Sequence, residues 1–76
     1  MEELLAYLAR GLVSEPDAVQ VTRAERDGAV VLELRVAPGD VGKVIGRQGR
    51  VVRALRTVAR ASAARSGERV LVEVVE

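Results

Sequence analysis

The sequence predicts an α+β fold in which three helices pack on one face of a three-stranded mixed sheet. Its hydrophobic residues follow a helical period in some stretches and alternate in others, in the order helix, strand, strand, helix, helix, strand. Two helices separate the last two strands, and a crossover of that kind makes the strands that it joins parallel neighbours. Of the 76 residues, 49% are hydrophobic and 30% are charged. This length and composition predict one globular domain over residues 1–76.

An amphipathic helix is predicted over residues 2–13, because leucines recur there at helical spacing. Glu2 and Glu3 stand in its first turn, where negative charge suits the helix dipole. Pro16 ends the pattern, since proline lacks the amide hydrogen and disfavours helix in the residue before it. We expect Tyr7, the single aromatic residue, to be half buried on this helix.

A β-hairpin is predicted next, because two runs rich in β-branched residues flank a two-residue turn signal. The runs cover residues 19–26 and 29–36, and Asp27-Gly28 between them suits a type I′ turn. In the second run one set of alternate residues is entirely apolar, so we expect the face that they share to lie in the core. That set is Val30, Leu32, Leu34 and Val36.

The second half of the chain predicts two helices, a glycine-bounded interruption and a last strand. Asp40 is placed to cap a short helix over residues 41–45. Residues 46–49 interrupt the helical pattern, which resumes over 50–65, and alternation over 69–75 predicts the third strand. In the longer helix the apolar residues and the arginines occupy neighbouring sectors. One side therefore faces the core and the other carries positive charge.

Positive charge is concentrated in one segment, although the net charge of the chain is only +1. From Asp40 to Arg65 there are seven basic residues and one acidic residue, a net charge of +6, whereas the rest of the chain carries −5. Such an asymmetry is typical of a surface that meets phosphate groups. A solvated arginine-rich helix is the alternative, and the charge by itself does not decide between the two.

The residue types that are missing exclude most enzyme classes. The chain has no His and no Cys, so the commonest general base, the best nucleophile and the usual zinc ligands are absent. We expect no enzymatic activity, no metal and no cofactor. One aromatic residue is also too few for reading nucleic acid by base stacking. The start is acidic and the apolar run 4–9 is far shorter than the ~20 residues that span a bilayer, so we expect a cytoplasmic protein.

The segment with the most chemical information is the glycine-bounded loop between the two helices of the second half. Gly46 and Gly49 bracket Arg47 and Gln48, and glycines allow a tight turn and a close approach to a ligand. Amides at the start of the following helix point toward such a loop, which suits a sugar-phosphate backbone. A P-loop needs G-x-x-x-x-G-K-[ST] and a dinucleotide fingerprint needs G-x-G-x-x-G, and neither spacing is present.

Residues 44–52, Val-Ile-Gly-Arg-Gln-Gly-Arg-Val-Val, resemble the KH-domain signature. In that signature an aliphatic pair precedes G-x-x-G, and an aliphatic residue follows three positions after the second glycine. The predicted order of elements is that of a type II KH domain. Essentially the full chain, including an Ala- and Arg-rich helix after the loop, resembles the small bacterial stand-alone KH proteins of the KhpA (YlqC) family.

The resemblance implies that single-stranded RNA, about four nucleotides of it, binds in a groove between the loop and the sheet edge. Carried onto this sequence, the loop holds the sugar-phosphate backbone and two basic residues flank it. The implied RNA-binding residues are Lys43, Gly46, Arg47, Gln48, Gly49 and Arg50.

Three arginines lie outside the signature and form a candidate secondary phosphate track, with a solvated helix face as the alternative. They are Arg53, Arg56 and Arg60. The aliphatic signature positions Val44, Ile45 and Val52 are favoured as core residues over base contacts.

The functional prediction is a non-enzymatic RNA-binding module that acts as an RNA chaperone or post-transcriptional regulator. The alternative is a protein-interaction module that dimerises or recruits a larger partner. The resemblance implies both a homodimer and a heterodimer with the larger KH protein Jag (KhpB), whereas the basic filling of the loop favours RNA. Apolar residues beyond the needs of one core also predict a homodimer. They are Val31, Leu71 and Val75 on the sheet face opposite the core, and Ala59, Ala61, Ala63 and Ala64 on the long helix.

Overall fold

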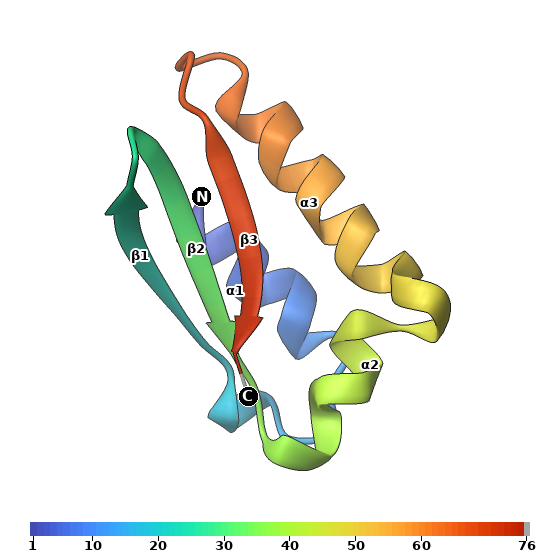
Figure 1. Ribbon diagram of the computed structural model, residues 1–76. Coiled ribbons are helices and arrows are strands. Elements are labelled where there is room, and N and C mark those ends of the chain that lie inside the picture. The colour runs from blue at the N-terminus through green and yellow to red at the C-terminus, as the bar shows by residue number, and fades with distance from the viewer. Residues whose placement is uncertain (76) are drawn as a thin grey trace.

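The computed structural model describes residues 1–75, which form a three-stranded sheet backed by three helices (Figure 1). The strands are β1 (Gln20–Arg26), β2 (Ala29–Arg35) and β3 (Val70–Val75). Their order in the sheet is β1-β2-β3, and β2 pairs antiparallel with β1 and parallel with β3. The predicted mixed sheet is therefore confirmed.

The hairpin turn between β1 and β2 has the predicted geometry. Asp27 and Gly28 both have positive φ, 53° and 76°, as a type I′ turn requires. The turn sets Arg26 opposite Ala29, and this pairing fixes the register along the hairpin. With this register, the helix-facing side of β2 is the apolar side.

All three helices lie on one side of the sheet, as predicted (Figure 1). They are α1 (Glu2–Arg10), α2 (Val41–Ile45) and α3 (Arg50–Ala63), and short 3₁₀ turns cover Pro16–Ala18, Pro38–Asp40 and Arg47–Gly49. Two helices end earlier than the sequence suggested. After α1, Leu12 N–H donates to Ala9 O at 3.0 Å, and after α3 the amide and hydroxyl of Ser66 both donate to Ala63 O. These local hydrogen bonds end each helix by satisfying its last carbonyls.

The core lies between the helices and the sheet. Its members come from α1, α2, α3 and the helix-facing side of β2 and β3, and they include Leu5, Ala9, Leu32, Leu34, Val44, Leu55, Ala59, Val70 and Val72. Of the aliphatic signature positions, Val44 and Val52 are buried and Ile45 is partly buried. Their favoured interpretation as core residues is confirmed for Val44 and Val52.

The sheet face opposite the helices exposes less apolar surface than the sequence predicted. Val31 was predicted to be exposed there, but it is 1% exposed. Arg26 of β1 pairs with Glu73 of β3 at 2.8 Å, and these two residues line one shallow hollow with Val31 and Leu71. The long side chains of the ion pair span the central strand, and their aliphatic stems cover apolar surface. Val31 is therefore not available as a contact surface.

Two smaller predictions about exposure also fail. Tyr7 is 73% exposed rather than half buried. Ala59 and Ala63 are in the core, and only Ala61 and Ala64 of the alanines near the end of α3 are exposed. Among residues 1–75, no helix is long and apolar enough to cross a bilayer.

Candidate functional site

The glycine loop is a single tight turn between α2 and α3. Gly49 N–H donates to Gly46 O at 3.1 Å, and Arg50 N–H donates to Arg47 O. The first amides of a helical turn have no acceptor within that turn, so the backbone N–H groups of Arg47 and Gln48 are left for other partners. The loop therefore presents donors at its centre, between its two glycines.

Gly46 is sterically required at the entrance to this loop. Its φ and ψ are 77° and 171°, a region that is essentially restricted to glycine. A Cβ there would lie 2.4 Å from Val51 Cγ2 and 2.8 Å from Val51 N. Gly49 also has a positive φ, 73°, but the nearest atom to a Cβ at that position would be 3.9 Å away. The close approach at Gly46 thus fixes how the loop turns into α3.

The two residues between the glycines are exposed, and one of them has an unusual backbone conformation. Gln48 has a φ of 57°, in the left-handed region that non-glycine residues seldom adopt. Such conformations cost free energy and are concentrated at ligand-binding segments. Arg47 beside it is exposed as well. The side chains at the centre of the loop are therefore available to a ligand rather than to the core.

Two arginines of α3, Arg53 and Arg56, follow the loop within the first two turns of the helix. Arg53 donates from Nε to Gly49 O at 3.4 Å and from a terminal nitrogen to Gln48 O at 3.1 Å. Arg56 donates from Nε to Val72 O of β3 at 3.3 Å. One arginine thus contacts the loop and the other contacts the sheet.

A shallow groove of about 250 Å³ lies between α3 and β3. It is lined by Arg56 and Arg60 on the helix and by Leu71, Val72 and Glu73 on the strand. Within the described residues, β3 has a strand neighbour on one side only, so the groove follows a free sheet edge. Arg56 and Arg60 line one wall, and in the strand wall the carboxylate of Glu73 is paired with Arg26, so an extended chain with negative charge fits the groove.

Lys43 points away from the loop centre, toward the segment after α1. Its Nζ lies 3.4 Å from Asp40 Oδ1 and donates to Ser14 Oγ. Asp40 also accepts hydrogen bonds from Ser14 N–H at 3.1 Å and Glu15 N–H at 3.0 Å. These amide donors, Ser14 first, hold the pKa of Asp40 below its ordinary value against the opposing effect of burial, and Lys43 lowers it further.

Asp40 therefore has a different role from the one predicted. It stands at the N-cap position of α2, but its carboxylate makes no capping hydrogen bond to that helix. It instead joins the first turn of α2 to residues 14 and 15. Ser14 was missed altogether, because a contact between residues 26 positions apart leaves no local pattern in the sequence.

The structure brings together only part of the predicted site. Gly46, Arg47, Gln48 and Gly49 form one continuous turn. Arg50 lies on the side of α3 that faces α1, where it lines an apolar hollow with Leu8, Leu12 and Val58. Lys43 is held by Asp40 and Ser14, as described above. The loop centre and the α3–β3 groove thus remain as the candidate interface.

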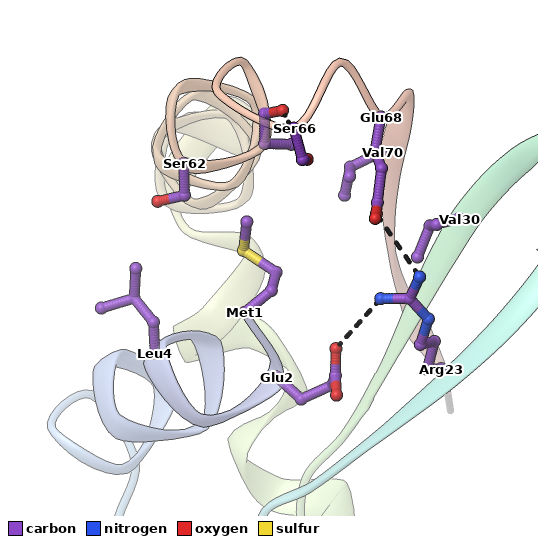
Figure 2. A pocket seen from close by; sticks show the side chains of 10 residues that line it. Met1, Glu2, Leu4, Arg23, Val30, Ser62, Ser66, Glu68 and Val70 are labelled. Atoms are coloured by element: carbon purple, nitrogen blue, oxygen red, sulfur yellow. Dashed lines mark hydrogen bonds and ion pairs between the residues drawn. The ribbon is translucent and has the colours of Figure 1, made fainter.

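A larger cavity, of about 510 Å³, lies at the other end of α3 (Figure 2). Figure 2 shows Arg23 between the carboxylates of Glu2 and Glu68, with N–O distances of 3.6 and 3.4 Å. Met1 and Ser62 also line this cavity. Because its charges pair with one another, this cavity is a less suitable anion site than the loop.

The fold and the loop together define a KH domain: two helices joined by G-x-x-G, packed on a mixed three-stranded sheet. A family model described as KhpA/KhpB, KH domain, matches residues 2–74. The chain therefore belongs to the KhpA/KhpB family of KH domains.

Curated relatives match the chain over almost its whole length. RNA-binding protein KhpA of Clostridium acetobutylicum is 48% identical over 75 residues, which cover 99% of this chain and 100% of that protein. The proteins of the same name from Treponema pallidum and Aquifex aeolicus are 52% and 45% identical. Their alignments cover 99% and 100% of this chain, and 94% and 96% of those proteins.

Solved structures show the same fold within a larger protein. Aquifex aeolicus Era Y63A bound to GDP·AlF4⁻ superposes with a TM-score of 0.67 at 22% identity. Era in complex with MgGDPNP and nucleotides 1506–1542 of 16S ribosomal RNA gives 0.68 at the same identity. Each match covers 96% of this chain and 28% of the Era chain. At this identity the likeness concerns the fold alone.

Proposed function

We propose that this chain is a single, non-enzymatic KH domain that binds single-stranded RNA through the G-x-x-G loop and the α3–β3 groove. The observation that carries the proposal is the loop itself: a glycine-bounded turn whose central amides have no acceptor within the turn and whose central residues are exposed, at the start of an arginine-bearing helix. Curated relatives at 45–52% identity are RNA-binding proteins by name. A role as RNA chaperone or post-transcriptional regulator in the cytoplasm fits this activity.

The arrangement favours backbone recognition of the nucleic acid. Amides at the loop and cations along α3 suit phosphate oxygens, since charge-assisted hydrogen bonds are the stronger ones. The single aromatic residue, Tyr7, belongs to α1, so neither the loop nor α3 carries an aromatic side chain on which bases could stack. We therefore expect a dissociation constant on the order of micromolar for one domain.

The test replaces the exposed centre of the loop. Arg47→Asp with Gln48→Asp places two carboxylates where phosphates are proposed to lie, so binding of a short unstructured RNA should be abolished. Because both side chains are exposed, the melting temperature should stay close to that of the unchanged protein. Fluorescence anisotropy and thermal unfolding measure the two quantities.

A matched control variant carries the same two substitutions, one Arg→Asp and one Gln→Asp, outside the loop. Arg10 and Gln20 are exposed on α1 and β1, so Arg10→Asp with Gln20→Asp alters the net charge equally. This control should still bind RNA. Equal loss of binding in both double variants would show a general charge effect and contradict the assignment of the loop.

We also propose that the chain pairs with a second copy of itself or with a KhpB partner, as its family model covers both KhpA and KhpB. Most of the large hydrophobic side chains that are exposed lie on the helices. These are Leu4 and Tyr7 on α1 and Val58 on α3, whereas Leu12 follows α1 and Leu71 lies on β3. Contact with another chain would remove this surface from water.

A further inference from the structure

The three arginines on one side of α3 differ in what they already contact. Arg53 donates to two loop carbonyls, and Arg56 donates to a carbonyl of β3. Among residues 1–75, Arg60 makes neither an ion pair nor a side-chain hydrogen bond, although it is exposed in the same sector. The three arginines carry the same charge, but only the guanidinium group of Arg60 is left without a partner among the described residues.

The acceptors of Arg53 belong to the two peptide groups that close the loop. The carbonyl of Gln48 shares a peptide plane with Gly49 N–H, which donates to Gly46 O. The carbonyl of Gly49 shares a plane with Arg50 N–H, which donates to Arg47 O. In a trans peptide the N–H and C=O point in opposite directions. Both planes are therefore fixed at both ends, by the loop on one side and by Arg53 on the other.

Arg56 makes a corresponding contact with β3, the strand wall of the groove. Its acceptor, Val72 O, lies on β3, and Arg56 and Val72 both line the α3–β3 groove. Arg56 is half-buried, whereas Arg53 and Arg60 are exposed. The helix is thus joined to the loop by one guanidinium group and to the sheet edge by the next.

We propose that Arg53 and Arg56 are positioning residues, Arg53 holding the loop and Arg56 holding the edge strand β3 against α3, and that Arg60 alone of the three contacts RNA phosphate. This inference rests on the proposed function. It divides the candidate phosphate track into two arginines that shape the site and one that supplies charge to it.

Salt dependence separates the two roles. Each phosphate contact with a single strand contributes about 0.7 to the slope of log affinity against log salt. Arg60→Gln should lower the slope by about 0.7. Arg53→Gln and Arg56→Gln should leave the slope unchanged and lower the affinity about fivefold each, the effect of losing a typical hydrogen bond. The triple variant should lower the slope by about 0.7, whereas three phosphate contacts would lower it by about 2.

The conservative variant Arg53→Lys keeps the charge but loses the planar fork that reaches two carbonyls. It should bind short oligouridine as weakly as Arg53→Gln, with the slope of the unchanged protein. Full affinity in Arg53→Lys, or a slope reduced by about 0.7 in Arg53→Gln, would overturn the positioning role.

A measurement without RNA keeps this inference separate from the proposed function. In Arg53→Gln, amide hydrogen exchange at Gly49 and Arg50 should become several-fold faster, while Arg60→Gln should leave it unchanged. Unchanged exchange in Arg53→Gln overturns the proposal for the loop. If the unchanged protein binds no oligouridine at low salt, the proposed function and the role of Arg60 fail, and exchange alone decides whether Arg53 holds the loop.

Discussion

Asp40 is the one charged side chain that is buried among residues 1–75, at 3% exposed. Two backbone amides and Lys43 surround its carboxylate. Burial of a carboxylate is unfavourable unless hydrogen bonds and a cation compensate for lost water, and here both are present. The residue therefore connects the segment after α1 with the helix that leads into the loop.

The lowered pKa of Asp40 predicts a pH dependence of folding stability. A carboxyl whose pKa is lower in the folded chain than in the unfolded one stabilises the fold above the unfolded pKa, about 4. That contribution is lost as the pH falls through the folded pKa. We therefore expect the melting temperature to decrease once the pH is lowered below about 4. Thermal unfolding at a series of pH values measures this decrease.

Asp40→Asn is the control for this pH dependence. It removes the charge, keeps one oxygen acceptor, and leaves Lys43 without its ion-pair partner. The variant should be less stable at neutral pH, and the stability difference from the unchanged protein should shrink under acid. A stability difference that stays constant down to the lowest pH would show that ionisation of Asp40 does not stabilise the fold.

At the level of elements, the loop gives a matched pair of glycine substitutions. Gly46→Ala should destabilise the fold by about 3 kcal/mol or more, because backbone strain adds to the overlap with Val51. In Gly49→Ala the new methyl group makes only an ordinary contact of 3.9 Å with Val52, so the left-handed backbone alone is unfavourable, a cost of about 1–2 kcal/mol. Denaturant unfolding measures both. Equal costs would mean that Val51 shifts to admit the new methyl group.

The elements themselves were predictable from the sequence where their signals are local. Asp27-Gly28 determines the hairpin turn, and the glycines at 46 and 49 mark the break between α2 and α3. The candidate loop could be predicted for the same reason. The exact helix ends could not, because they depend on hydrogen bonds such as those of Ser66, for which the sequence offers several alternatives.

Contacts between distant residues account for what the sequence could not show. Arg53, Arg56 and Arg60 look alike in the sequence, and only the position of β3 beside α3 separates Arg56 from Arg60. Val31 looks like free apolar surface until Arg26 and Glu73 meet across the central strand. The first outcome depends on how β3 packs beside α3, and the second depends on the register of the three strands.

For the whole molecule, the distribution of exposed hydrophobic residues determines where a second copy fits. The hollow between α1 and α3 is lined by Leu8, Leu12 and Val58, whereas the open sheet face carries the Arg26–Glu73 ion pair. We therefore expect self-association to depend on the helices more than on the sheet. This surface differs from the one that the sequence suggested.

Sedimentation of two single variants tests this expectation. Val58 and Leu71 are similarly exposed, at 39% and 37%, and lie on the helix side and the sheet side. Val58→Glu should shift the protein toward monomer at micromolar concentration, because burying the new charge in an interface is unfavourable. Leu71→Glu should leave the association unchanged. The opposite result would place the interface on the sheet, and a monomeric unchanged protein would contradict dimerisation.

The close approach at Gly46 also has a consequence for how the domain can diversify. The steric constraint falls on Gly46, at one end of the loop, whereas Arg47 and Gln48 are exposed. Mutations that change the ligand preference of the loop therefore fall at other positions than the mutation of Gly46 that unfolds the domain. A library randomised at position 47, with Gly46 kept and position 48 limited to residues that tolerate a left-handed backbone such as Gly, Asn and Gln, would explore new ligands on a scaffold whose stability hardly varies.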